Sequence, residues 1–186
     1  MNAFVDVSNI RIETERLLLR AWEERDLYDF YEYASVEGVG EMAGWNHHQS
    51  LEESGCILSS FIRHKKTFAL EFKESGKVIG SLGLEPRDEA AGLEESLRGR
   101  EVGYVLSKDY WGRGLMPEAV KAVIDYCFLV LDFDYLTCGH FDYNDRSRRV
   151  VEKCGFTYLK NVVTSTVRGI DEPGKMYVIY NPYKEK

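Results

Sequence analysis

The chain has 186 residues, a formal net charge of -7 and a sequence pI near 5.2. Hydrophobic residues make up 44% and charged residues 30%, which fits one soluble globular domain over residues 1–186 and argues against disorder. The acidic balance disfavours nucleic acid as a partner, because binding to a phosphate backbone needs a basic face. No apolar run approaches the length of a membrane span, and the charged N-terminal segment is unlike a secretory signal. We therefore expect a cytoplasmic protein without a membrane partner.

The cysteines and histidines predict neither disulfides nor a metal site. The four cysteines are widely spaced and include no C-x-x-C pair, so we interpret them as reduced and mostly buried. His47 and His48 are adjacent on one predicted loop, so their side chains point apart, and no spaced third ligand supports them. We expect no metal cofactor.

The first half of the chain contains two amphipathic helices between strands. A compact apolar run at 16–21 predicts a strand, and helical spacing of apolar residues predicts a helix at 24–35. A capping-box pattern at Ser50 begins a second helix that runs to about His64. The runs 67–72 and 78–84, separated by a turn signal, predict a hairpin.

The second half begins with a predicted strand at 100–106 and a helix whose apolar stripe continues from Met116 to Leu131. A strand at 135–141 follows, and then a helix that Asn144 caps and Gly155 ends. The closing strands are predicted at 157–167 and 176–180, with the turn between them at 172–174. This order predicts a mixed α/β (α+β) fold with one central sheet flanked by helices.

Two glycines, Gly112 and Gly114, stand between the predicted strand 100–106 and the long helix. Glycine permits positive φ and close approach to the main chain, and a helix N-terminus attracts anions. A phosphate site is one interpretation, and a tight connection that happens to hold two glycines is the other. The spacing fits neither the P-loop nor the Rossmann pattern.

A second motif runs from Asn144 to Phe156 and includes Ser147 and Gly155. On its own it describes a capped helix with an exposed charged face and a glycine stop. Together, the two motifs read Tyr-Trp-Gly-x-Gly-x-x-x-Glu-Ala and, after a helix and a strand, Asn-x-x-Ser followed by Gly-Phe. In this combination the chain resembles the GCN5-related N-acetyltransferases (GNAT) and, within them, the RimJ/RimL-like branch. The resemblance covers about residues 13–160.

This resemblance implies an acetyl-CoA cleft where the parallel strands 100–106 and 135–141 splay apart. It implies that Val105 and Leu106 offer main-chain groups to the pantetheine arm and that Asn144 lies near it. It also implies a pyrophosphate cradle formed by the backbone of Gly112, Arg113, Gly114, Leu115 and Met116.

Two residues are the candidate catalytic groups. Many relatives have a tyrosine as general acid seven residues after the asparagine, where this chain has Val151, and the resemblance suggests Ser147 as the substitute. Glu101 begins a strand and shares a face with Gly103 and Val105. It is either a solvated strand end or a general base that acts directly or through water.

Several assignments stay open in the sequence. Trp45, between the first two helices, is either a core anchor or part of the acceptor pocket. The residue that meets the CoA 3′-phosphate is Arg113 or a basic residue on the helix after Asn144, and the candidates there are Arg146, Arg148, Arg149 and Lys153. The oligomeric state is open, with a homodimer among the options.

The leading hypothesis is an N-acetyltransferase that moves acetyl from acetyl-CoA to a primary amine, either a protein N-terminus or a small molecule, by direct attack in a ternary complex. The alternative is an acyl-CoA-binding sensor that has lost turnover, which the valine at position 151 favours. An interaction module that uses the region around Trp45 is a third option. The amine acceptor cannot be identified from the sequence.

Overall fold

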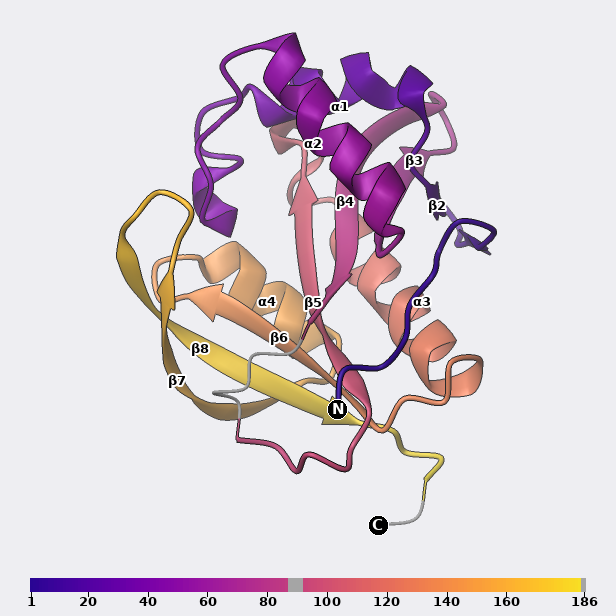
Figure 1. Ribbon diagram of the computed structural model, residues 1–186, viewed down its shortest axis with the longest axis vertical. Coiled ribbons are helices and arrows are strands. Elements are labelled where there is room, and N and C mark those ends of the chain that lie inside the picture. The colour runs from indigo at the N-terminus through magenta and orange to yellow at the C-terminus, as the bar shows by residue number, and fades with distance from the viewer. Residues whose placement is uncertain (87–91, 185–186) are drawn as a thin grey trace.

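The computed structural model describes residues 1–86 and 92–184, and in this part of the chain the strands form one continuous sheet (Figure 1). The strand order is β1-β2-β3-β4-β5-β6-β8-β7. Neighbouring strands are antiparallel except β5 and β6, which are parallel. The strands are β1 Arg11–Glu13, β2 Leu17–Ala21, β3 Thr67–Phe72, β4 Lys77–Glu85, β5 Gly99–Leu106, β6 Tyr135–Phe141, β7 Thr157–Ser165 and β8 Asp171–Tyr180.

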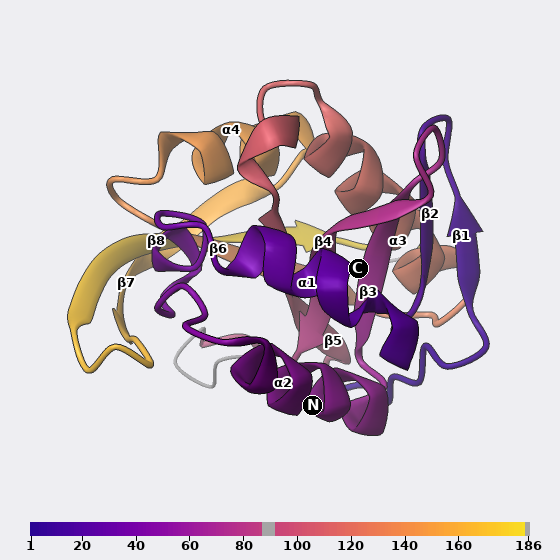
Figure 2. The ribbon, with the colours of Figure 1, turned by 90° about the horizontal axis from the view of Figure 1, so that it is seen from above.

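Helices cover both faces of this sheet, which confirms the expected mixed α/β fold (Figure 2). They are α1 Leu27–Ala34, α2 Leu51–His64, α3 Leu115–Leu129 and α4 Asp145–Lys153. The helices α1 and α2 pack against each other over one face, and α3 and α4 lie over the other. A functional group on the sheet can therefore face either helical layer.

The alternation of strand residues divides the interior into two cores. Phe68, Leu70 and Phe72 of β3 are buried in the main core with the apolar stripe of α3. Ala69, between them, faces the opposite way and packs in a second core under α1 and α2. The predicted stripe of α3 is confirmed, because its members from Met116 to Phe128 are buried.

The two parallel strands separate at the centre of the sheet. Only three residue pairs join β5 to β6, and the last of them is Glu101 with Thr137. Beyond that point β5 follows β4 up to Leu106, while β6 follows β8 up to Phe141. In Figure 1, β4 and β5 run upward as β6 and β8 turn aside. Beyond Glu101 and Thr137, the facing edges of β5 and β6 are not paired with each other, so the sheet has a gap between its two helical layers.

The last predicted turn is wrong. The segment 172–174 lies inside β8, and the connection between β7 and β8 lies instead at 166–170, where Gly169 has a φ of 73°. Gly174 pairs with Phe141, and a β-carbon at Gly174 would lie 2.5 Å from the carbonyl oxygen of His140. The glycine therefore serves close strand packing, which sequence cannot distinguish from a turn.

Other boundaries differ by smaller amounts. The strand β1 was not predicted, because three residues carry little periodic signal. Leu131 lies outside α3, which ends at Leu129. The first helix begins with a separate 3-10 turn at Glu24–Asp26. The predicted 67–72 and 78–84 hairpin is confirmed, as are the helix caps at Ser50 and Asn144.

Gly174→Ala should destabilise the fold by about 1–3 kcal/mol, because the added methyl group has to displace the backbone of β6. Gly103→Ala is the matched control, since a β-carbon there would meet no other atom within 4 Å. Chemical denaturation of both variants measures the difference. Equal stability of the two variants would contradict this account of Gly174.

Candidate active site

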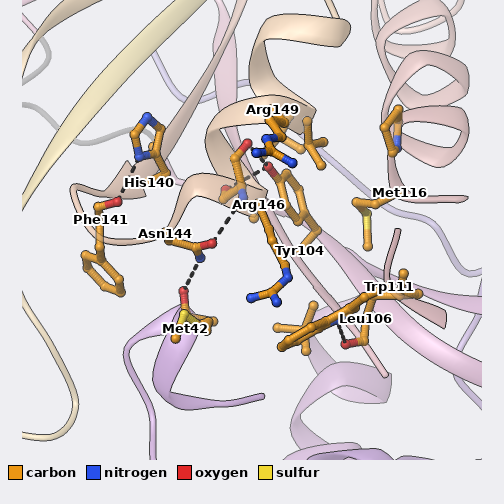
Figure 3. A pocket seen from close by; sticks show the side chains of 18 of the residues that line it. Met42, Tyr104, Leu106, Trp111, Met116, His140, Phe141, Asn144, Arg146 and Arg149 are labelled. Carbon is orange, nitrogen blue, oxygen red and sulfur yellow. Dashed lines mark hydrogen bonds between the residues drawn. The ribbon is translucent and has the colours of Figure 1, made fainter. Parts of the chain in front are cut away.

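A cavity of about 480 Å³ passes through the gap between β5 and β6. Residues from both faces of β5 line it, among them Glu101 and Val105 on one face and Tyr104 on the other. The N-terminal end of α3 and the first turns of α4 form further parts of the wall. Figure 3 shows the pocket with Asn144 and Arg146 of the α4 segment beside Tyr104 of β5. A long ligand can thus enter past two helix ends and reach both faces of the sheet.

The helix α3 begins at a backbone turn that only glycine adopts readily. Gly112 and Gly114 have φ values of 76° and 77°, and Gly114 is the N-cap residue. No side chain caps α3. The first N–H groups of this helix therefore lack the usual side-chain acceptor, and both glycines line the cavity with Leu115 and Met116. This combination suits an anion.

A partly exposed brace of three side chains holds this turn against the start of β2. The guanidinium of Arg16 forms a salt bridge with Glu118 at 2.7 Å and donates a hydrogen bond of 2.9 Å to the Arg113 carbonyl. Thr14 donates a second hydrogen bond to Glu118, at 2.6 Å. Burial alone would raise the pKa of Glu118, but these hydrogen bonds outweigh burial and lower that pKa below its ordinary value. The Glu of the glycine motif thus fixes the direction of the turn's backbone.

The basic residues near the cavity divide into two groups. The Arg113 guanidinium lies over the rings of Phe72 and Tyr110, at 5.2 and 5.1 Å, so its side chain packs on aromatic rings. Arg148 pairs with acidic neighbours on α4. The members of the charged face that line the cavity are Arg146, Arg149 and Lys153.

Trp111 lies in the cavity wall between the glycine turn and β5 and contacts residues on both sides. Its indole nitrogen donates a hydrogen bond of 2.7 Å to the carbonyl of Leu106, and Arg146 lies over its ring at 4.6 Å. The Leu106 carbonyl, expected to meet pantetheine, is therefore already engaged by one donor. A carbonyl accepts two hydrogen bonds, so this contact leaves a second lone pair.

Glu101 lies where the parallel strands separate. It is the last residue of β5 that pairs with β6, and its side chain shares the face of Val105, which packs under α1 and α2. A β-carbon at Gly139 of β6 would stand 3.8 Å from a carboxylate oxygen of Glu101. Gly139 thus leaves space beside the carboxylate at the mouth of the gap.

Asn144 and Ser147 lie on the opposite side of the gap, at the start of α4. Asn144 Oδ1 accepts a hydrogen bond from the Ser147 N–H at 3.1 Å, and Asn144 Nδ2 donates to the Met42 carbonyl at 3.0 Å (Figure 3). The amide expected beside pantetheine therefore caps its own helix and ties it to the segment between α1 and α2. Both polar atoms keep capacity for one more hydrogen bond.

Tyr104 was not among the predicted site residues. Its phenol oxygen lies 2.8 Å from Ser147 Oγ and 3.3 Å from the Ser147 carbonyl. Burial raises the pKa of Tyr104 well above its ordinary value, so the phenol stays protonated at neutral pH. The signal available in the sequence was its position three residues after Glu101, which places the two side chains on opposite faces of one strand.

The structure places Trp45 in the second core rather than in the cavity wall. Its ring centroid lies 5.0 Å from that of His48, and a β-carbon at Gly40 would overlap the indole. The nearby residues that do line the cavity are Val39, Met42 and Ala43. Sequence reasoning missed them because their approach depends on the loop between α1 and α2.

Residues of the C-terminal strands add a further part of the cavity wall. Phe141 at the end of β6, Val162 and Thr164 of β7, and Met176 of β8 contribute to it. Their contribution depends on the long-range pairing of β8 between β6 and β7, which leaves no local pattern in the sequence.

Neither a metal cluster nor a membrane span is found in the described residues. No group of three or more candidate metal ligands occurs there. His47 instead contacts Glu41 at 2.8 Å, and His48 contacts Ser54 at 2.7 Å. No described helix combines the length and the apolar character that crossing a bilayer would require.

Comparison with known proteins places this cleft in a family. The family model of the acetyltransferase (GNAT) domain matches residues 16–157, which is most of the chain, so the chain belongs to the GNAT acetyltransferase family. This is a family of acyltransferases that use acetyl-CoA.

Three relatives illustrate the match. The uncharacterized N-acetyltransferase YoaA of Bacillus subtilis is 25% identical over 150 residues, which are 78% of this chain and 81% of YoaA. The [ribosomal protein uS5]-alanine N-acetyltransferase of Escherichia coli is 26% identical over 160 residues, 81% of this chain and 80% of that protein. The structure of Mycobacterium smegmatis RimJ in complex with CoA-disulfide has a similar fold, with a TM-score of 0.78 at 17% identity over 98% of this chain and 93% of RimJ.

Glu118→Gln should remove a pH-dependent part of the stability. Because the folded pKa of Glu118 is lowered, its contribution is present above the unfolded pKa of about 4.3 and is lost as pH falls through the folded value. We expect the free energy of unfolding of the variant to be lower than that of the wild type by about 1–3 kcal/mol at pH 7. This difference should shrink as the pH falls. Thermal unfolding between pH 7 and 3 measures this. The exposed neighbour Glu15→Gln is the control, and an equal profile for both variants would contradict the brace.

Proposed function

We propose that this protein is an acetyl-CoA-dependent N-acetyltransferase that transfers acetyl to a primary amine by direct attack within a ternary complex. The observation that carries the proposal is the gap between β5 and β6, with Glu101 on one face and Ser147 beyond the other. A thioester held in such a gap is open to an amine on one side and can release its sulfur on the opposite side.

The cofactor would bind along the cavity wall. The N–H groups at the start of α3 would hold the pyrophosphate, because the glycine turn lacks a side-chain cap and presents them to the cavity. At the open edge of β5, the main chain of Leu106 would pair with the pantetheine amides in place of the missing strand. Val105 would line the arm with its side chain, because its N–H and C=O groups face Ser81 of β4. Arg146, Arg149 and Lys153 are the candidates for the 3′-phosphate, since Arg113 packs on aromatic rings. Asn144 would contact the arm through its remaining hydrogen-bond capacity.

Glu101 would act as general base, directly or through water. An ammonium has no lone pair, so the acceptor must lose a proton before it attacks the carbonyl carbon. A carboxylate beside the open gap can take that proton and also attracts a cationic acceptor. The segment from Val39 to Ala43, and not Trp45, would form the adjoining acceptor wall.

Ser147 would assist the departure of the CoA thiolate. The amine lone pair forms the new C–N bond, and the C–S bond breaks with its electron pair moving to sulfur. A hydroxyl beside that sulfur stabilises the developing charge. A covalent acetyl-cysteine is disfavoured, because no cysteine is among the described residues that line the cavity and burial raises the pKa of the nearby Cys138.

The fold does not identify the amine acceptor, so an acceptor screen has to distinguish between protein N-termini and small-molecule amines. The similarity to an enzyme named for acetylating the alanine of ribosomal protein uS5 supports including peptide N-termini, and the cavity of about 480 Å³ also has room for a small amine. The cytoplasmic location and a homodimer stay predictions.

The direct test is thiol release from acetyl-CoA with an amine panel. Peptides beginning with Ala or Ser, polyamines, amino-acid amides and aminoglycosides cover the acceptor classes. Amine-dependent release with intersecting initial-rate lines supports the proposal. Tight CoA binding with no release for any amine would favour the sensor alternative, and parallel lines would indicate a covalent intermediate.

Gly112→Ala and Gly114→Ala should each weaken acetyl-CoA binding by about 10- to 100-fold, because a β-carbon intrudes on the pyrophosphate and one or more charge-assisted hydrogen bonds are lost. Gly76→Ala is the matched control, since Gly76 has a φ of 70° and open space around it but lies outside the cavity. Calorimetry on the folded variants measures Kd. The cradle is wrong if all three variants bind with the wild-type affinity.

Glu101→Gln should lower kcat/KM on the order of 10²-fold at neutral pH and less at high pH, where free amine is already present. The recovery should begin near pH 8 for an α-amine and nearer pH 10 for a lysine-like amine. Glu85→Gln, on the neighbouring strand opposite Glu101, controls for a general loss of charge. A loss that is constant across the pH range would leave Glu101 as an electrostatic or structural group.

A further inference from the structure

The hydroxyl of Ser147 has more than one possible hydrogen-bond direction. It lies in the first turns of α4, where a serine hydroxyl can donate back to a main-chain carbonyl three or four residues earlier. A hydroxyl carries one hydrogen, so a back bond of that kind would leave nothing to donate into the cleft. The proposed role of Ser147 therefore depends on which neighbouring group fixes the orientation of its hydroxyl hydrogen.

Tyr104 contacts the Ser147 hydroxyl. Its phenol oxygen is 2.8 Å from Ser147 Oγ, a hydrogen-bond distance typical of two hydroxyls. Figure 3 shows Tyr104 reaching from β5 toward the start of α4, and both residues line the cavity. The aromatic ring packs against the main core, so the phenol is held in place by a rigid strand.

We propose that Tyr104 is a positioning residue that donates a hydrogen bond to Ser147 Oγ and thereby directs the single Ser147 hydrogen into the cleft, toward the sulfur of the departing thiolate. This inference rests on the proposed acetyl transfer. Tyr104 lies on β5, outside the Asn144–Phe156 motif, so the motif alone does not identify this positioning role.

Either hydroxyl could donate across the 2.8 Å Tyr104–Ser147 contact, and the proposed direction rests on distance, because the other acceptor within reach of the phenol hydrogen, the Ser147 carbonyl, lies farther away at 3.3 Å. Burial raises the pKa of the phenol, so its hydrogen stays available for donation at neutral pH. With Tyr104 donating, Ser147 Oγ acts as acceptor there and its own hydrogen is free to point elsewhere. The acceptor that the reaction creates in the gap is the sulfur.

Tyr104 does not give up its proton in this scheme. A thiol has a pKa of about 8.5, below that of an ordinary phenol, so full proton transfer from Tyr104 to the thiolate would be uphill. The electron pair of the broken C–S bond stays on sulfur, and the amine proton leaves to Glu101 or water. Tyr104 and Ser147 supply hydrogen bonds to the developing charge without changing their own protonation.

A double-mutant cycle tests this coupling. Ser147→Ala should lower kcat on the order of 10²-fold, as for loss of one donor to developing charge. Tyr104→Phe should lower kcat about tenfold, the value of one hydrogen bond, with the acetyl-CoA Kd unchanged. In the Ser147→Ala background, Tyr104→Phe should have no further effect, because its target is gone. Tyr126→Phe, also packed on the main core but outside the cavity, is the control and should keep wild-type kcat.

Each alternative outcome has a distinct meaning. Wild-type kcat in Tyr104→Phe, or an equal loss in both backgrounds, would overturn the inference while leaving acetyl transfer intact. Absence of thiol release by the wild-type protein with every amine would overturn the proposed function, and the inference with it.

A second measurement keeps the phenol in place and changes only its acidity. Fluorinated tyrosines at position 104 lower the phenol pKa and strengthen it as a donor while preserving the ring. Because burial holds the native phenol protonated, kcat should rise as the substituent makes the phenol more acidic. A kcat that is flat or falls across this series would overturn the donor role, even if Tyr104→Phe proved too unstable to assay.

Discussion

The early end of pairing between β5 and β6 is the constraint on which the site depends. Buried main-chain N–H and C=O groups need partners, and an open strand edge within a sheet leaves them without the usual ones. Here β5 is paired on its outer edge up to Leu106 but on its inner edge only to Glu101. An extended ligand with amide groups would supply the missing hydrogen bonds. The fold thus provides an open strand edge in the cavity wall, which is where the proposed cofactor would bind.

The same constraint separates the chemical groups by face. Alternation along β5 directs Glu101 toward the α1 and α2 layer and Tyr104 toward the α4 layer. A carboxylate on one side and hydroxyl groups on the other suit the proposed reaction, in which the amine approaches from one face of the sheet and sulfur leaves toward the other. Neither group has to cross the sheet, because the gap already connects the two layers.

The sequence predicted the parts of this arrangement that local patterns encode. The stripe of α3, the caps at Ser50 and Asn144 and the glycine turn before α3 depend on residues within a few positions of one another, and the structure shows them. The family resemblance added the open gap. The wrong turn at 172–174 shows the limit of such patterns, since proline and glycine within β8 have the composition of a turn, whereas the glycine serves a close contact with β6.

What the sequence could not predict depends on contacts between distant segments. The Arg16–Glu118 bridge joins residues 102 positions apart, and the Tyr104–Ser147 contact spans 43. Trp45 was left between two roles because only the packing of the α1–α2 connection decides that its ring lies in the second core. The residues of β7 and β8 in the cavity wall depend on strand order, which no local pattern records.

Three glutamates near the cleft show how environment gives one residue type different tasks. Burial would raise the pKa of Glu41, yet hydrogen bonds from His47 and the Gly38 N–H hold it at about 2, so this carboxylate anchors the loop at 38–47. Glu118 is likewise held ionised by Arg16 and Thr14 and anchors the cradle. A carboxylate committed to several fixed donors is a poor proton acceptor, because protonation would break those bonds. Glu101 differs in position, since it borders the gap beside Gly139, where a substrate amine can reach it. The two anchored carboxylates hold the loop at 38–47 and the glycine turn before α3, whereas Glu101 lines the cavity, which is where the proposed proton transfer would take place.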